Sequence, residues 1–138
     1  GKISTWQNWP EYLANLDIDI ALAPINSSKF NKGKSNIKLL EFGALGIPVV
    51  ASRFGPYLEI EREGVGLCAD GVSEWKSKIE SLITSPTDAR LLGTIAADYT
   101  YSRYDIKDNW HKWESAYREI HSRTAKMRQR EAGRLRSG

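Results

Sequence analysis

Short apolar runs alternate along the chain with segments in which apolar residues recur at helical spacing. Residues 18–24 and 48–52 are apolar almost throughout, which is typical of parallel strands buried on both faces. Between them, residues 36–45 have the spacing of a helix, with Ser35 as its N-cap and Gly46 at a left-handed C-terminal position. Strand, helix and strand in this order predict a right-handed parallel crossover.

The remaining pattern is mainly helical. A short helix over residues 9–16 begins with Pro10 near its first turn, and its Leu13 and Leu16 should face inward. After a third short strand at residues 66–69, helices are predicted around residues 75–83, from residues 85–88 onward, and from an Asp105 cap. We therefore expect an α/β fold: a partial Rossmann-like parallel sheet of about three strands, with flanking helices and a helical C-terminus.

The last predicted helix carries an apolar stripe whose members recur alternately at four and three residues. The spacing is typical of a docking face. Its members are Ile106, Trp110, Trp113, Tyr117 and Ile120.

Composition narrows the class of protein. The chain has 138 residues, of which 41% are hydrophobic, enough for one globular domain. The single Cys68 excludes a disulfide framework and a cysteine zinc site, and no apolar run approaches the roughly 20 residues of a membrane span. Without a signal-peptide pattern we expect a cytoplasmic protein, with peripheral attachment to the inner face of the membrane left open.

The basic charge is concentrated at the C-terminus. The formal net charge is +3, yet residues 118–138 hold seven Lys or Arg and two Glu. Residues 1–117 consequently carry 13 basic and 15 acidic side chains. We expect residues 1–121 to form one partial domain and residues 122–138 to form a basic, flexible tail.

The residues that could bind a ligand lie where the first two strands end. In an open parallel sheet, ligands bind beyond the carboxyl ends of the strands, here the loop of residues 24–34 and the turn containing Arg53, Gly55 and Tyr57. The helix after the first loop places Lys34, Lys38 and Glu41 near one edge of its buried face. Two interpretations stay open: Glu41 binds sugar hydroxyls while Lys38 neutralises a phosphate, or the two residues simply form an i, i+3 ion pair.

Residues 36–52 carry a family resemblance. They read NIKLLEFGALGIPVVAS, which resembles the donor-site segment of retaining GT-B glycosyltransferases of the group 1 (family 4) type, often K-x-x-E-x-x-A-x-G-x-P-V-V-A-S. Residues 19–24 and 64–67 also look like neighbouring strands of that family. The resemblance covers roughly residues 9–121, and it implies the C-terminal, donor-binding domain in partial form.

The resemblance implies a role for each matching residue. Glu41 would bind the ribose hydroxyls of the nucleotide and Lys38 the phosphates of the donor. Amides around Ser35, Asn36 and Ile37 would face the pyrophosphate or the sugar.

One position departs from the family pattern. Many members carry another acid eight residues before Glu41, where this chain has Gly33. In those members the acid contacts the transferred sugar. In this chain, Asn31 or Lys34 is the candidate substitute for it.

The same resemblance implies that donor binding belongs to this domain, and catalysis and acceptor binding to another. The donor would be a UDP- or GDP-linked sugar, held without a metal or other cofactor, because the loop lacks an Asp-x-Asp pair. The acceptor, a glycan, lipid or protein, and the catalytic residue would belong to an N-terminal domain outside these residues. We therefore expect no transferase activity from this piece alone.

Two rivals from other classes remain. The Arg-rich C-terminal segment would suit a module that binds nucleic acid or an acidic partner, although the acidic body makes nucleic acid the less favoured partner. The other rival is a catalytically silent scaffold that keeps the fold and lacks the site.

Overall fold

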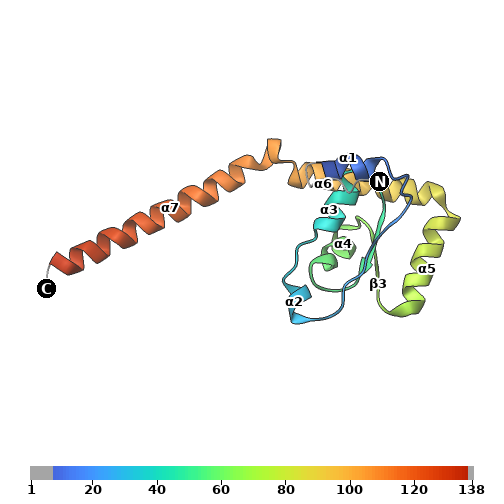
Figure 1. Ribbon diagram of the computed structural model, residues 1–138, viewed down its shortest axis with the longest axis horizontal. Helices are drawn as coiled ribbons and strands as arrows, with labels where there is room; N and C mark the ends of the chain where they lie inside the picture. Colours follow the sequence, from blue (N-terminus) through green and yellow to red (C-terminus); the bar gives the residue numbers. More distant parts are fainter. Residues whose placement is uncertain (1–7, 137–138) are drawn as a thin grey trace. The chain divides into compact units, whose positions relative to one another are not determined.

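The computed structural model describes residues 8–136, with the side chains of residues 8–128. It is a mixed α/β fold in which helices flank a three-stranded parallel sheet (Figure 1), so the predicted fold class is confirmed. The chain divides into two compact units, Gly1–Ser102 and Arg103–Gly138. These units meet after Ser102; the division predicted after residue 121, between a partial domain and a tail, stays a prediction.

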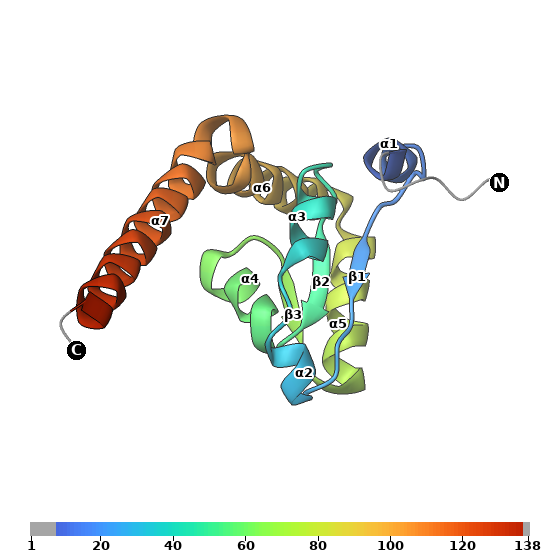
Figure 2. The ribbon, with the colours of Figure 1, turned by 60° about the vertical axis from the view of Figure 1, so that its left-hand side comes forward.

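The sheet has the strand order β1-β2-β3, which Figure 2 shows almost face on. Its strands are β1 (Ala21–Ala23), β2 (Val49–Ser52) and β3 (Leu67–Ala69). Both pairings are parallel, with Leu22 opposite Val50 and Ala51 opposite Cys68. The central strand β2 is fully buried over its first three residues.

The edge position of β1 overturns one expectation. Ala21 and Ala23 are buried, but the side chain between them, Leu22, is 49% exposed. The strand is therefore buried on one face only among the described residues. Its apolar sequence resembles that of a central strand, and only the strand order reveals that it lies at an edge.

Helices account for most of the remaining described residues. They are α1 (Trp9–Ala14), α2 (Lys29–Lys32), α3 (Ile37–Gly43), the 3₁₀ turn η2 (Gly55–Tyr57), α4 (Leu58–Glu63), α5 (Gly71–Thr84), α6 (Pro86–Tyr104) and α7 (Ile106–Arg136). The predicted crossover helix is confirmed as α3, and Gly46 after it has φ +70°, as a left-handed terminus requires.

Three local expectations are wrong. Leu16 is 42% exposed, because α1 already ends at Ala14. The N-cap of α3 is Asn36 rather than Ser35. The loop after β1 contains the one-turn helix α2, whose cap Ser28 accepts a hydrogen bond from the Asn31 amide.

Two apolar clusters cover the two faces of the sheet. Val49 and Ala51 of β2 pack in one cluster with Leu39 of α3 and Ile60 of α4. Val50, which points to the opposite face, packs with Leu82 of α5. Figure 1 shows α3 and α4 on one side of the strands and α5 on the other, a layered arrangement typical of parallel α/β folds.

Helix α6 packs directly on the end of α3 through two glycines. A Cβ atom at Gly93 would fall 1.9 Å from the Gly46 carbonyl oxygen, and one at Gly43 would fall 3.1 Å from the Ala96 carbonyl oxygen. The Tyr101 hydroxyl also donates to the Ala44 carbonyl at 2.9 Å. Without side chains at the two glycines, the backbones can approach this closely.

The second unit is helix α7 and the residues just before it. Asp105 caps the helix, as predicted, because its Oδ1 accepts the Lys107 amide at 2.9 Å. Residues 122–136, expected as a flexible tail, continue this helix. Within residues 8–136 no helix is both long and apolar enough to cross a membrane.

Candidate functional site

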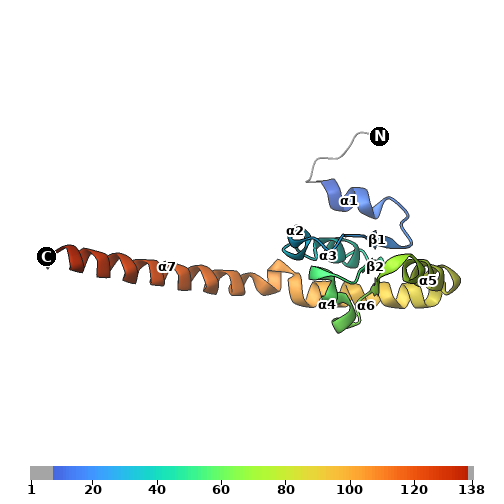
Figure 3. The same cartoon turned by 90° about the horizontal axis from the view of Figure 1, so that it is seen from below.

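A pocket of about 530 Å³ lies at the carboxyl end of β1. Helix α1, which Figures 2 and 3 place on the β1 side of the sheet, forms one wall, and α3 forms another. Most of the lining side chains are apolar. The lining residues are Trp9, Leu13, Leu22, Ala23, Pro24, Ile25, Lys34, Ser35, Ile37, Lys38, Phe42 and Tyr57.

Lys38 and Glu41 form an ion pair at the edge of this pocket. Lys38 Nζ lies 2.7 Å from Glu41 Oε2, and the two side chains are 44% and 25% exposed. The same ammonium lies 5.4 Å from the centroid of the Trp9 ring, within cation–π range. The i, i+3 pairing considered from the sequence is therefore present.

Tyr57 adds a neutral polar group to the pocket. Its side chain is buried, and burial, followed by the negative charge of Glu41, raises the pKa of its phenol. The phenol consequently keeps its proton well above neutral pH. Glu41 itself is not among the lining residues, but its ion pair with the lining residue Lys38 places this carboxylate beside the pocket.

Four of the seven predicted donor-site residues line the pocket: Lys34, Ser35, Ile37 and Lys38. Lys34 Nζ lies 5.1 Å from the centroid of the Phe30 ring, and Ile37 is 49% exposed. Glu41 reaches the group through its ion pair with Lys38. Lys34 and both predicted anchors, Lys38 and Glu41, therefore lie at or beside this pocket.

The other two predicted residues are engaged elsewhere. Asn31 is buried and donates from Nδ2 to Asn26 Oδ1 at 2.6 Å and to the Asn26 carbonyl at 3.1 Å. Asn36 Nδ2 donates to Glu59 Oε2 at 2.8 Å, and Glu59 also accepts from the Tyr99 hydroxyl. Neither side chain lines the pocket, and both stabilise the loops around it.

Trp9 is a lining residue that the sequence analysis did not assign to the site. It lies before β1 and outside the loops at the strand ends, and no local pattern signals that α1 folds back beside α3. Its proximity to Lys38 arises from tertiary packing alone.

A second pocket, of about 610 Å³, contains Arg53 beyond the ends of all three strands. The guanidinium is already engaged by Glu61, at 3.0 Å from Nε, and by Glu74, at 2.8 Å from Nη1. Two carboxylates therefore compensate this cation, which makes it a poor anion receptor. Among the described side chains, no three His, Cys, Asp or Glu residues are placed to hold a metal ion.

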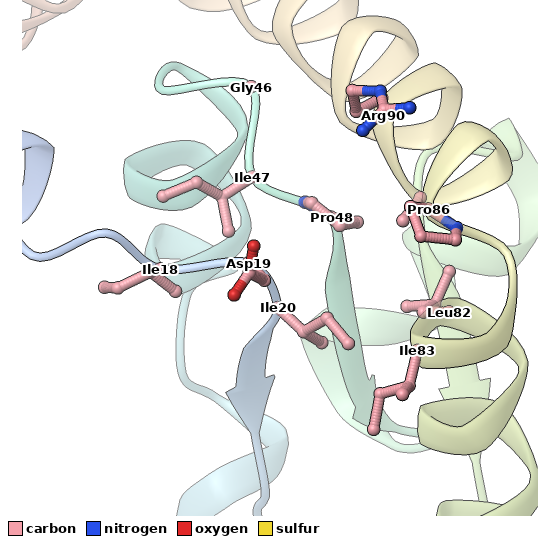
Figure 4. Close-up of a pocket in the computed structure, with 11 residues that line it drawn as sticks. Ile18, Asp19, Ile20, Gly46, Ile47, Pro48, Leu82, Ile83, Pro86 and Arg90 are labelled. Carbon is pink, nitrogen blue, oxygen red and sulfur yellow. The ribbon is translucent and has the colours of Figure 1, made fainter.

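A third pocket, of about 330 Å³, lies at the amino ends of β1 and β2 (Figure 4). Its walls are mainly aliphatic, and its two charged residues come from different elements: Asp19 precedes β1 and Arg90 lies on α6. Ligands of parallel sheets bind at the carboxyl ends of the strands. The pocket beside Lys38 is therefore the better candidate site.

Comparisons with known proteins add no relative. No protein-family model, characterised protein or solved structure matches the chain.

Proposed function

We propose that the pocket beside Lys38 and Glu41 binds the nucleoside diphosphate of a nucleotide-sugar donor, as the donor-binding part of a retaining glycosyltransferase. The single observation that carries the proposal is the Lys38–Glu41 pair at the mouth of a pocket of suitable size. The resemblance of residues 36–52 to the donor segment of group 1 enzymes supports the same assignment.

The geometry suggests how the pair would respond to a donor. Lys38 is 44% exposed, and an exposed ion pair contributes at most about 1 kcal/mol. A diphosphate, which offers more charge than one carboxylate, would replace Glu41 as the partner of Lys38 at little cost. Glu41 would then be free to accept hydrogen bonds from two adjacent hydroxyls of a ribose.

Lys34 and Ser35 supply the next contacts in this proposal. Both line the pocket, and Lys34 would add a second positive charge near the phosphates. Asn31 and Asn36 would act indirectly, since their side-chain amides hold the Asn26 loop and Glu59. The sugar acceptor and the catalytic group would come from a partner domain.

A nucleotide titration tests the proposal. Amide chemical shifts of the labelled chain would be followed with UDP, GDP, ADP and their sugar derivatives. We expect saturable shifts in residues 31–41 with at least one of them. Lys38→Ala and Glu41→Ala should each weaken binding at least about tenfold, as expected for loss of a hydrogen bond involving a charged group.

The chain offers a matched control for both variants. Lys76 and Glu80 form an i, i+4 pair on α5, with 3.7 Å between Nζ and Oε1, and neither residue lines the pocket. Lys76→Ala and Glu80→Ala should leave nucleotide binding unchanged within about twofold. The proposal fails if no nucleotide shifts residues 31–41, or if the control variants weaken binding as much as the pocket variants.

A deoxynucleotide isolates the role of Glu41. The wild-type chain should prefer UDP over 2′-deoxy-UDP, if UDP is the nucleotide bound, and Glu41→Gln should reduce that preference while Lys38→Ala should not. Removal of residues 122–138 should leave nucleotide binding intact. Loss of binding after that truncation would favour the rival interpretation, a basic module.

The chain alone should transfer no sugar. We expect neither glycosyl transfer nor donor hydrolysis from the purified chain, because the resemblance assigns catalysis and acceptor binding to another domain. Transfer that is detectable above a Lys38→Ala control would contradict this division.

A further inference from the structure

Helix α7 carries an apolar stripe that nothing else in its own unit covers. Its side chains are exposed, and Trp113, at the centre, is 62% exposed. Three of its members are aromatic. The stripe consists of Ile106, Trp110, Trp113, Tyr117, Ile120 and Met127.

The stripe is narrow and its borders are basic. With about 100° per residue, the apolar members fall within an arc of about 100°. Arg123 and Lys112 lie about 40° and 60° beyond one border of the arc, and Arg128 lies at the other border. Long basic side chains at such positions can extend along apolar surface while their charges reach away from it.

The polar face of α7 has an excess of positive charge. Residues 106–128 contain six Lys or Arg and three Asp or Glu. Two of the three acids are paired within the helix: Glu114 with Arg118 at 2.7 Å and Glu119 with Arg123 at 2.5 Å. The surface that borders the stripe is therefore complementary to an anionic partner.

We propose that α7 binds the surface of an anionic lipid bilayer, lying parallel to it with the stripe in the headgroup region. Trp and Tyr rings favour this region because one part of each ring is apolar and another is polar. An exposed apolar stripe combined with basic borders and low overall hydrophobicity is the pattern of helices that lie on membranes. The proposal goes beyond the donor site and does not depend on it.

Flanking charges argue against a second copy of the chain as the occupant. The four-and-three spacing would also suit a two-stranded coiled coil. In a parallel pair, however, Arg123 would face Arg128 of the other chain, and like charges at these positions oppose pairing. A bilayer containing anionic lipid is attracted to both arginines instead.

Vesicle binding by the full chain tests the proposal. The probes are vesicles of phosphatidylcholine with about one-third phosphatidylserine, and vesicles of phosphatidylcholine alone. We expect co-sedimentation with the anionic vesicles that is at least about tenfold stronger than with the neutral ones, and weaker binding as salt increases.

Two substitutions that add the same charge separate the stripe from simple electrostatics. Trp113→Glu places a carboxylate at the centre of the stripe, and Ser115→Glu places one on the opposite face of the helix. Trp113→Glu should weaken vesicle binding more than about thirtyfold, and Ser115→Glu about fivefold or less. Circular dichroism would confirm that both variants keep their helix content.

Several outcomes would overturn the proposal. These are no binding to anionic vesicles, equal binding to neutral vesicles, and equal losses in the two variants. Self-association or nucleic-acid binding that depends on Trp113, without vesicle binding, would assign the stripe to another partner.

Discussion

Gly93 of α6 and Gly46 of the turn after α3 are in such close contact that a Cβ atom on Gly93 would lie 1.9 Å from the Gly46 carbonyl oxygen. Gly93→Ala should therefore lower the free energy of unfolding by about 3 kcal/mol, since the backbones must separate. Urea unfolding measures this change. Gly33→Ala is the control: its new Cβ would meet nothing closer than 3.8 Å, so equal losses would contradict the close packing.

The hydroxyl of Tyr99 on α6 donates to Glu59 on α4, whose other oxygen accepts from Asn36. Tyr99→Phe should lower the free energy of unfolding by about 1–3 kcal/mol, because the bond reaches a partly buried carboxylate. Tyr101→Phe, which removes a neutral, exposed hydrogen bond to Ala44, should cost about 1 kcal/mol or less. Calorimetry or urea titration can rank the two variants, and the reverse order would argue against this network.

Because the thiol of Cys68 is buried, we expect the folded protein to lose stability in alkaline solution. Burial is the main cause that raises its pKa above the ordinary value of 9.0. Above that pH the unfolded chain has lost the proton while the folded chain keeps it, so the free energy of unfolding falls as pH rises. Tyr57, whose pKa is raised from 10.0, contributes further above that value. Cys68→Ala should reduce the fall in the free energy of unfolding between about pH 9 and 10, as measured by urea titration. An unchanged fall would contradict this role of the Cys68 thiol.

For Glu74 we expect the opposite pH dependence: the free energy of unfolding falls as the solution becomes acidic. The backbone amide of Asp70, followed by the Arg53 guanidinium, lowers its pKa below 4.5. The stabilisation is present above this value and is lost as pH falls through the lower folded-state pKa. Glu74→Gln should therefore flatten the acid dependence of unfolding. Glu80→Gln on the same helix serves as control, and matching acid profiles in both variants would exclude the proposed role of Glu74.

The crossover from β1 to β2 was predictable because its signals are local. A glycine with φ +70° and a proline separate α3 from β2, and continuous apolar residues mark the buried strand. The exposure of Leu22 was not predictable, because it depends on which strand lies next to β1. Helix α4, with only six residues, was too short for its spacing to separate it from a loop.

The candidate site also has a part that the sequence predicts and a part that depends on tertiary packing. Lys38 and Glu41 lie three residues apart on one helix, so the sequence alone predicts their proximity. The position of the Lys38 ammonium over the Trp9 ring depends on how α1 folds back beside α3. The side chains of Asn31 and Asn36 could not be assigned from the sequence, because their acceptors belong to the packed loop and to α4.

Helix α7 also has a consequence for hydrogen exchange. Within its own unit, its backbone amides are protected by intrahelical hydrogen bonds only, and a helix without tertiary support opens easily. Amide deuteration should therefore proceed through residues 106–136 much faster than through the fully buried strand β2. The binding partner of the stripe would be recognised by the protection that it adds to these amides.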